Sequence, residues 1–382
     1  MEVFSSIYSI PYVIVFVLYI FLFVYESHLI NKQRRTSIIR FSAILIFLIF
    51  FGLRGFINTD WMSYYPYFYN ISSIDSEFRY EPGFILFTLV VKFFIPNYFG
   101  WQFLSCLIDV IFLDHFVRKY SRYYSLFFLL FFIFGGLILE INLLRNLKSI
   151  LIFIYSIRFI ENKKFIAYLI CNLVGASFHI TSLCFIPLYF ILNRQFPRKV
   201  IIFLFILSNI IYLLQIKFIT PVMLLLGEKL GGVFWYLVSS HTNNAESYGI
   251  TIGFLERFMS FALFYFGYEK MSKNLPSARI FFNIYLFYFI VFTAFSEVAV
   301  FANRFSILFI CSYWFLYPAL YESIRIYSNK IIFIVLLSIY GVMKLISGND
   351  NILCRYDNLL TGIQSYQDRV RVFEKSENSI FK

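Results

Sequence analysis

The chain has 382 residues, of which 60% are apolar, 23% are aromatic and only 14% are charged. Because a soluble domain carries about 25% charged residues, this composition excludes a soluble globular domain, a disordered tail and a disulfide scaffold. A spanning helix with its connection takes roughly 30 residues. The length and the mean hydropathy of +0.75 therefore predict an all-α polytopic membrane protein with about 10 to 12 transmembrane helices.

Basic residues sort the connections by side of the membrane. The net charge is +12, and six short clusters between apolar runs hold 18 of the 33 Lys and Arg residues. Such clusters determine topology and do not indicate nucleic-acid binding, and the positive-inside rule places them in the cytoplasm. The N-terminus and the C-terminal tail then lie outside. The clusters are at 32–40, 118–122, 158–164, 194–199, 270–279 and 325–330.

In chain order, the apolar runs 7–25 and 38–53 predict the first two spans. Each interval between two cytoplasmic clusters must hold an even number of crossings. The short run 83–95 is therefore predicted to be a juxtamembrane helix inside an external loop, 54–97, before the chain returns at 99–117.

The run 165–192 follows a simple pair of spans at 123–142 and 143–160, and it has basic residues at both ends. One crossing would violate the charge rule, whereas a re-entrant pair of half-length helices that meets near His179 would satisfy it. Broken helices of this kind line cavities at functional sites in membrane proteins. The alternative is a single tilted span.

The later runs predict a second external loop and the remaining spans. The loop is 217–250, and the expected domain organisation is one integral membrane domain, 1–346, with an external polar tail, 347–382. The spans are expected at 200–216, 250–268, 280–296, 304–321 and 331–347.

Apart from those of the C-terminal tail, five arginines fall on the external side of this topology, where the charge rule disfavours them. Ionisable residues near the bilayer are functional candidates, and the planar guanidinium binds phosphate through two parallel hydrogen bonds. The set therefore predicts a phosphate or diphosphate site, with snorkelling to lipid headgroups or pairing with nearby acids as the alternative. The five are Arg54, Arg79, Arg145, Arg257 and Arg304.

Two further features point to chemistry on sugars. The segment 52–61 carries Asp60 and precedes a run of tyrosines that begins at Tyr64, which suits sugar rings, although an interfacial aromatic belt is the alternative. His179 is the only histidine deep in an apolar run, and it is either a catalytic group or a hydrogen-bonded core residue. Asp109 lies deep in the run 99–117 without a predicted partner.

Five short motifs keep one order along the chain. They are Gly-Leu-Arg-Gly-x-x-x-Thr-Asp at 52–60 with Tyr64 downstream, Tyr-Glu-Pro-Gly-Phe at 80–84, Leu-Arg-Asn at 144–146, Phe-His-Ile-Thr-Ser at 178–182 and Asn-Arg-Phe at 303–305. Together they make the chain resemble the EpsG family of Wzy-like polysaccharide (O-antigen) polymerases. After Leu-Arg-Asn such proteins often continue with a small residue, whereas this chain has Leu147-Lys148.

The resemblance implies a glycosyltransferase that polymerises undecaprenyl-diphosphate-linked oligosaccharide repeat units outside the bacterial cytoplasmic (inner) membrane. A flippase and a chain-length regulator of the same pathway would be its partners. An external loop with an acid, followed by a helix in the membrane plane, also looks like membrane glycosyltransferases of the GT-C type.

The expected site residues follow from these motifs and from the external arginines. Preorganised cations stabilise a leaving diphosphate, and a divalent ion could share this role. Because the nearby acids, Asp60 and Glu81, are scattered in the sequence, no metal and no cofactor are expected. Either Asp60 or His179 could orient or deprotonate the acceptor hydroxyl. The candidate catalytic residues are Asp60, His179 and Arg145, and the candidate substrate-binding residues are Arg54, Arg304, Arg257, Tyr64, Glu81 and Asn146.

Other functions remain open on the sequence alone. A flippase for the same lipid-linked units would need an alternating-access cavity, usually built from two related halves. An O-antigen ligase would use similar diphosphate chemistry but usually carries one very large external loop, and an acyltransferase would act on external sugars. A membrane scaffold would explain the topology but not the external arginines.

Overall fold

The computed structural model describes residues 3–73, 80–230 and 250–380. Within these ranges the chain is helical and forms no β-strand, so the predicted all-α polytopic membrane class is confirmed. The chain divides into two compact units, which are described separately. Unit 1 comprises residues 1–189 and 317–382, and unit 2 comprises residues 190–316.

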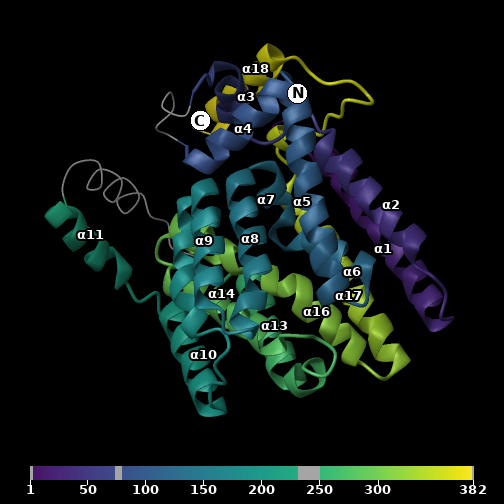
Figure 1. The fold of residues 1–382 in the computed structure, drawn as a ribbon, viewed down its shortest axis with the longest axis vertical. Coiled ribbons are helices and arrows are strands. Elements are labelled where there is room, and N and C mark those ends of the chain that lie inside the picture. Colours follow the sequence, from purple (N-terminus) through teal and green to yellow (C-terminus); the bar gives the residue numbers. More distant parts are fainter. Residues whose placement is uncertain (1–2, 74–79, 231–249, 381–382) are drawn as a thin grey trace. The chain divides into compact units, whose positions relative to one another are not determined.

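Unit 1 contains most of the long helices (Figure 1). Two π-helical turns, η2 (Leu48–Gly52) and η4 (Phe132–Gly136), interrupt its apolar runs. The helices are η1 (Ser6–Ser9), α1 (Ile10–Asn31), α2 (Ser37–Phe47), α3 (Trp61–Asn70), α4 (Pro82–Phe94), α5 (Tyr98–Tyr120), α6 (Tyr124–Phe131), α7 (Leu137–Ile141), α8 (Leu144–Glu161), α9 (Phe165–Phe178), η5 (Ile180–Phe190), α17 (Tyr327–Gly348), η7 (Ile352–Cys354) and α18 (Tyr366–Ile380).

Four described helices are long and apolar enough to cross a membrane, and a pair bent by 54° would be a fifth. This is fewer than the 10 to 12 spans that the length suggests, because several apolar runs end early or break into helices of 10–17 residues. The four are Ser6–Asn31, Tyr98–Tyr120, Tyr124–Ile141 and Tyr327–Gly348, and the bent pair is Ala299–Phe309 with Cys311–Ser323.

The predicted external loop 54–97 folds into two short helices, α3 and α4. The helix expected at 83–95 forms as α4, which begins at Pro82, a residue favoured in the first helical turn. In unit 1, α3, α4 and α18 gather at one end of the helices (Figure 1). The depth of α4 relative to a bilayer stays a prediction.

The run 165–192 is broken, as its charge pattern predicts. Helix α9 ends at Phe178, His179 is extended with φ −154° and ψ 126°, and the 3-10 helix η5 follows. At 1.5 Å per residue, the 14 residues of α9 are too few to cross a bilayer alone. The alternative of one continuous span does not form, and His179 lies at the break.

The C-terminal segment packs against the start of the external loop. The backbone N–H of Gly55 donates to the Asp357 carbonyl at 2.8 Å, and that of Leu359 donates to the Leu53 carbonyl at 2.8 Å. Arg369 is buried and ties the segment together by donating to the Leu353 carbonyl at 2.7 Å. The segment expected as a separate polar tail therefore shares a side with the loop 54–97, and which side that is stays a prediction.

Unit 2 is held together by stacked aromatic rings. The rings of Phe205 and Phe261 stack with centroids 3.8 Å apart, and those of Tyr212 and Phe254 stack at 4.2 Å. Within the predicted loop 217–250, residues 219–230 are helical, and 231–249, including the Phe-Trp-Tyr patch at 234–236, lie outside the described residues. The helices are α10 (Arg198–Leu213), α11 (Ile219–Leu230), α13 (Ile252–Met271), α14 (Ala278–Ala294), α15 (Ala299–Ser306) and η6 (Ile307–Phe309), and α16 (Cys311–Ser323) begins in this unit.

Candidate active site

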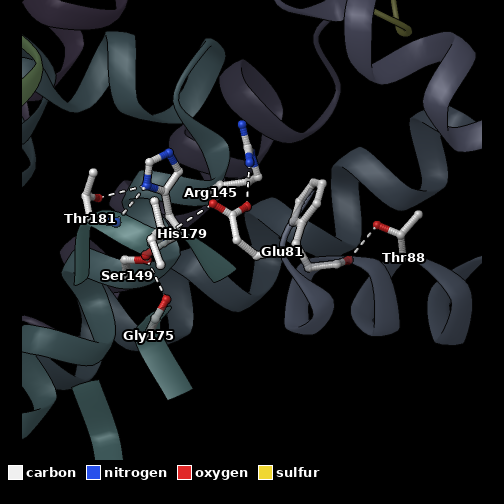
Figure 2. Close-up of polar contacts among 9 residues, drawn as sticks. Glu81, Thr88, Arg145, Ser149, Gly175, His179 and Thr181 are labelled. Atoms are coloured by element: carbon white, nitrogen blue, oxygen red, sulfur yellow. Dashed lines mark hydrogen bonds and ion pairs between the residues drawn. The ribbon is translucent and has the colours of Figure 1, made fainter. Parts of the chain in front are cut away.

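Glu81 joins three segments that are far apart in the sequence. One carboxylate oxygen accepts a hydrogen bond from Nη1 of Arg145 at 2.5 Å, and the other accepts the backbone N–H of Ile180 at 3.1 Å. The extended residue Glu81 precedes α4, Arg145 lies in the first turn of α8, and Ile180 follows the break after α9. Figure 2 shows Arg145, Glu81 and His179 clustered at this junction.

The guanidinium of Arg145 is held by aromatic rings as well as by Glu81. Its central carbon lies 4.8 Å from the ring centroid of Tyr80 and 5.9 Å from that of Phe84, and such cation–π contacts are favourable. The hydroxyl of Tyr64 also lies near the Arg145 guanidinium. Burial raises the pKa of the Tyr64 hydroxyl, and the positive charge of Arg145 opposes that shift. The side chain of Arg145 keeps 21% exposure, so the charge is oriented without being enclosed.

His179 takes a defined orientation from Thr181. The backbone N–H of Thr181 donates to Nδ1 of His179 at 3.3 Å, and the Thr181 hydroxyl lies 2.8 Å from the same nitrogen. Because Nδ1 accepts a hydrogen bond, the proton of the neutral imidazole is on Nε2. In Figure 2 the imidazole and the guanidinium of Arg145 point to the same side.

Small residues allow α4 and α9 to approach each other. A Cβ atom on Gly83 would lie 2.2 Å from the Ser177 hydroxyl and 2.8 Å from the Ser177 backbone carbonyl. Ser149 of α8 supports the end of α9 by donating to the Gly175 carbonyl at 2.8 Å (Figure 2). This packing places Glu81 beside the helix break.

Asp60 stands at the N-terminus of α3, four residues before Tyr64. The Thr59 hydroxyl donates to its carboxylate at 3.3 Å, and its negative charge contributes to the raised pKa of Tyr64. Asp60 therefore belongs to the neighbourhood of Tyr64 and, through Tyr64, to that of Arg145.

Arg54 makes structural hydrogen bonds inside unit 1. Its side chain is buried and donates to the Phe51 carbonyl and, at 2.8 Å, to the Glu140 carbonyl, while Gln102 donates to the Arg54 carbonyl at 2.8 Å. The two glycines that flank Leu53 and Arg54 make close contacts: Gly52 packs against Phe103, and Gly55 packs against the C-terminal segment at Asp357 and Ile363. This geometry stabilises the turn after η2, and ligand binding by Arg54 stays a prediction.

The other predicted residues lie on α8, in unit 2 and outside the described ranges. Asn146 is buried in the first turn of α8, next to Arg145. Arg257 and Arg304 belong to unit 2, where Arg257 stacks over Phe292 with 3.7 Å to the ring centroid and Arg304 is exposed on α15. Arg79 lies outside the described residues. The structure thus brings together Glu81, Arg145, His179 and Tyr64, and Asp60 lies near Tyr64.

Two residues of the site, Tyr80 and Thr181, were not predicted from the sequence, although both lie in the motifs quoted above. Tyr80 carries the guanidinium of Arg145, and Thr181 sets the orientation of His179. Their neighbours in the motifs, Glu81 and His179, were the only signal for them. Among the residues that the structure describes, no three His, Cys, Asp or Glu side chains are grouped as metal ligands.

One comparison with known proteins bears on this arrangement. The sequence model of the EpsG family matches residues 37–357. The chain belongs to the EpsG family. This is a family of polysaccharide polymerase-like proteins, and membership indicates an integral membrane enzyme of the glycosyltransferase type. Searches of curated proteins and of solved structures give no match.

The match covers both units of this EpsG-family protein and every residue of the cluster around Glu81. Several apolar helices of membrane-spanning length agree with a multi-pass membrane protein that acts in polysaccharide biosynthesis.

Proposed function

We propose that the protein polymerises undecaprenyl-diphosphate-linked oligosaccharide repeat units by glycosyl transfer on the external face of the bacterial cytoplasmic membrane. The observation that supports this most directly is the contact of Glu81 with Arg145 and with the backbone at the α9 break. It joins three of the motifs that resemble the family, and it presents one oriented, partly exposed guanidinium next to an imidazole.

The reaction breaks the bond between the anomeric carbon of the donor sugar and its diphosphate oxygen. The bond's electron pair passes to the diphosphate, and a hydroxyl of the acceptor glycan bonds to the anomeric carbon. Arg145 stabilises the charge that develops on the leaving diphosphate, since preorganised cations act most strongly in the transition state. Glu81 and Tyr80 hold its guanidinium in place.

The tautomer of His179 favours one assignment of the remaining roles. With its proton on Nε2, the imidazole is a hydrogen-bond donor and suits the leaving diphosphate. Asp60 would then accept the proton of the attacking hydroxyl. Tyr64 and the aromatic rings around it would pack against the sugar, and Asn146, Arg257 and Arg304 stay candidates for substrate contacts.

The test uses a strain without this protein, complemented by single variants. The deletion strain is expected to make surface glycan of one repeat unit, and Arg145→Ala and Glu81→Gln to leave polymer reduced by about 100-fold or more, as loss of a transition-state charge contact does. Arg371→Ala is the matched control, because this exposed arginine of α18 pairs with Asp368 at the surface.

Membrane insertion of each variant is checked by immunoblotting of membrane fractions. Full-length polymer in the deletion strain would contradict the polymerase function. Polymer that forms on its lipid carrier but is not transferred further would indicate a ligase. Full activity of Arg145→Lys would contradict recognition of phosphate by the planar guanidinium fork.

A further inference from the structure

A groove in unit 2 lies apart from the cluster around Glu81 in the sequence. It has a volume of about 950 Å³ and runs between α10, α13 and α14. Its floor is aromatic, since Phe205 stacks on Phe261 and also contacts Phe258, with centroids 5.2 Å apart. Only apolar chains or rings would be well accommodated by this floor.

One end of the groove is basic. Arg194, Arg198 and Arg279 line it together with Glu269, so that three guanidinium groups face one carboxylate. Glu269 pairs with Arg198, and both side chains are about three-quarters exposed, at 75% and 76%. Such an exposed pair contributes little and is easily exchanged. The end of the groove therefore carries an excess of positive charge.

The buried side-chain amide of Asn283 anchors the backbone of the segment that carries Arg194. Asn283 of α14 is 2% exposed and donates to the carbonyls of Leu192 at 2.7 Å and Arg194 at 2.9 Å. Arg279, one helical turn earlier on α14, donates to the Asn193 carbonyl at 3.4 Å. The backbone of the connection that carries Arg194 is thus anchored to α14, and Arg194 and Arg279 both line the groove.

The sides of the groove are open and apolar. Phe266 is 82% exposed and Ile206 is 52% exposed. In a membrane protein, such side chains contact acyl chains. A groove with a basic end and an apolar length matches an amphiphile with an anionic head.

We propose that this groove is a binding site for an anionic phospholipid, with the phosphate between Arg194 and Arg279 and an acyl chain over Phe205 and Phe261. A polyprenyl diphosphate shares this chemistry. The phospholipid is the occupant because the cluster 194–199 is predicted to be cytoplasmic, whereas the lipid-linked glycan is proposed to react outside. The anionic-lipid chemistry of the site rests on the groove alone, whereas the choice of the phospholipid over the polyprenyl carrier rests on the proposed function.

Native mass spectrometry of the full-length protein, delipidated in detergent, tests the proposal. Phosphatidylglycerol is expected to bind at least 10-fold more tightly than phosphatidylcholine of the same chain length, since each cation near an anionic headgroup contributes about 1 kcal/mol. Arg194→Gln with Arg279→Gln should remove this preference. Lys270→Gln with Lys273→Gln, which belong to the same basic cluster as Arg279 but do not line the groove, should keep it.

Each other outcome contradicts the proposal. Equal binding of the two phospholipids would show that the groove is an unselective lipid contact. Binding of undecaprenyl phosphate in the groove at concentrations that are too low for phosphatidylglycerol to bind would assign the groove to the polyprenyl carrier. Thermal unfolding of each variant confirms that it is folded, and a preference unchanged in the folded double Arg variant would place the lipid elsewhere.

Discussion

Among single residues, Glu81 determines how the candidate active site is assembled. It was expected as a substrate-binding residue because it lies in the Tyr-Glu-Pro-Gly-Phe motif, yet its two oxygens already accept hydrogen bonds from Arg145 and from the N–H of Ile180. A carboxylate so placed orients a cation more than it binds a neutral sugar. Its role in substrate binding stays a prediction, and the geometry favours a positioning role.

A second charged pair lies buried between α5 and α8. Lys148 donates to the carboxylate of Asp109 and, at 2.8 Å and 3.1 Å, to the hydroxyl and the carbonyl of Ser105. Asp109 is fully buried. The pair was out of reach of sequence analysis, because nothing in a single sequence joins positions 109 and 148. It holds the helix that carries Arg145.

We expect Lys148→Met to destabilise the protein by about 3–5 kcal/mol, because it leaves the charge of Asp109 buried without a partner. The double variant Lys148→Met with Asp109→Leu should recover most of the loss, since both charges are then removed. Thermal unfolding in detergent measures the difference. A single variant as stable as the unchanged protein would contradict the importance of the pair.

Between elements, the closest approach near the site is that of α4 and α9 at Gly83. Its Cβ position is already occupied by Ser177, including the backbone carbonyl at 2.8 Å. Since a backbone atom cannot rotate away, any larger residue must push the two helices apart. The distance from Glu81 to the break at His179 depends on this contact.

We expect Gly83→Ala to cost about 1–3 kcal/mol of stability and to lower polymer formation more than it lowers the amount of protein in the membrane. Gly348→Ala is the matched control, because no heavy atom lies within 4 Å of the Cβ that it would add. Polymer length and membrane content are measured together. Equal effects of the two substitutions would contradict the packing argument.

For the whole molecule, the predicted topology places the loop 54–97 and the C-terminal segment on the same side of the membrane, and the fold supports this. The backbone hydrogen bonds from Gly55 to Asp357 and from Leu359 to Leu53 require the loop 54–97 and the C-terminal segment to be on the same side of the membrane. The charge rule places both outside and the six basic clusters inside.

Single cysteines test this in a variant from which the five native cysteines have been removed. In intact cells, a membrane-impermeant maleimide should label cysteine at Ser73 and at Thr361, both exposed, and should not label it at Lys163 or at Asn329, which are also exposed. Permeabilised cells serve as the control, in which all four should react. Labelling of Ser73 without Thr361 would contradict the shared side.

The sequence by itself determined the membrane class, the break at His179, the helix at 82–94 and the motifs of the EpsG family, because hydropathy, charge and local order are written along the chain. Only the tertiary structure decided which charges meet. In the folded chain, Arg54 is buried, Glu81 pairs with Arg145 and Asp109 pairs with Lys148. The C-terminal segment packs against the loop after η2. Each of these contacts joins residues more than 30 positions apart, and its energy depends on burial and distance, which a single sequence does not contain.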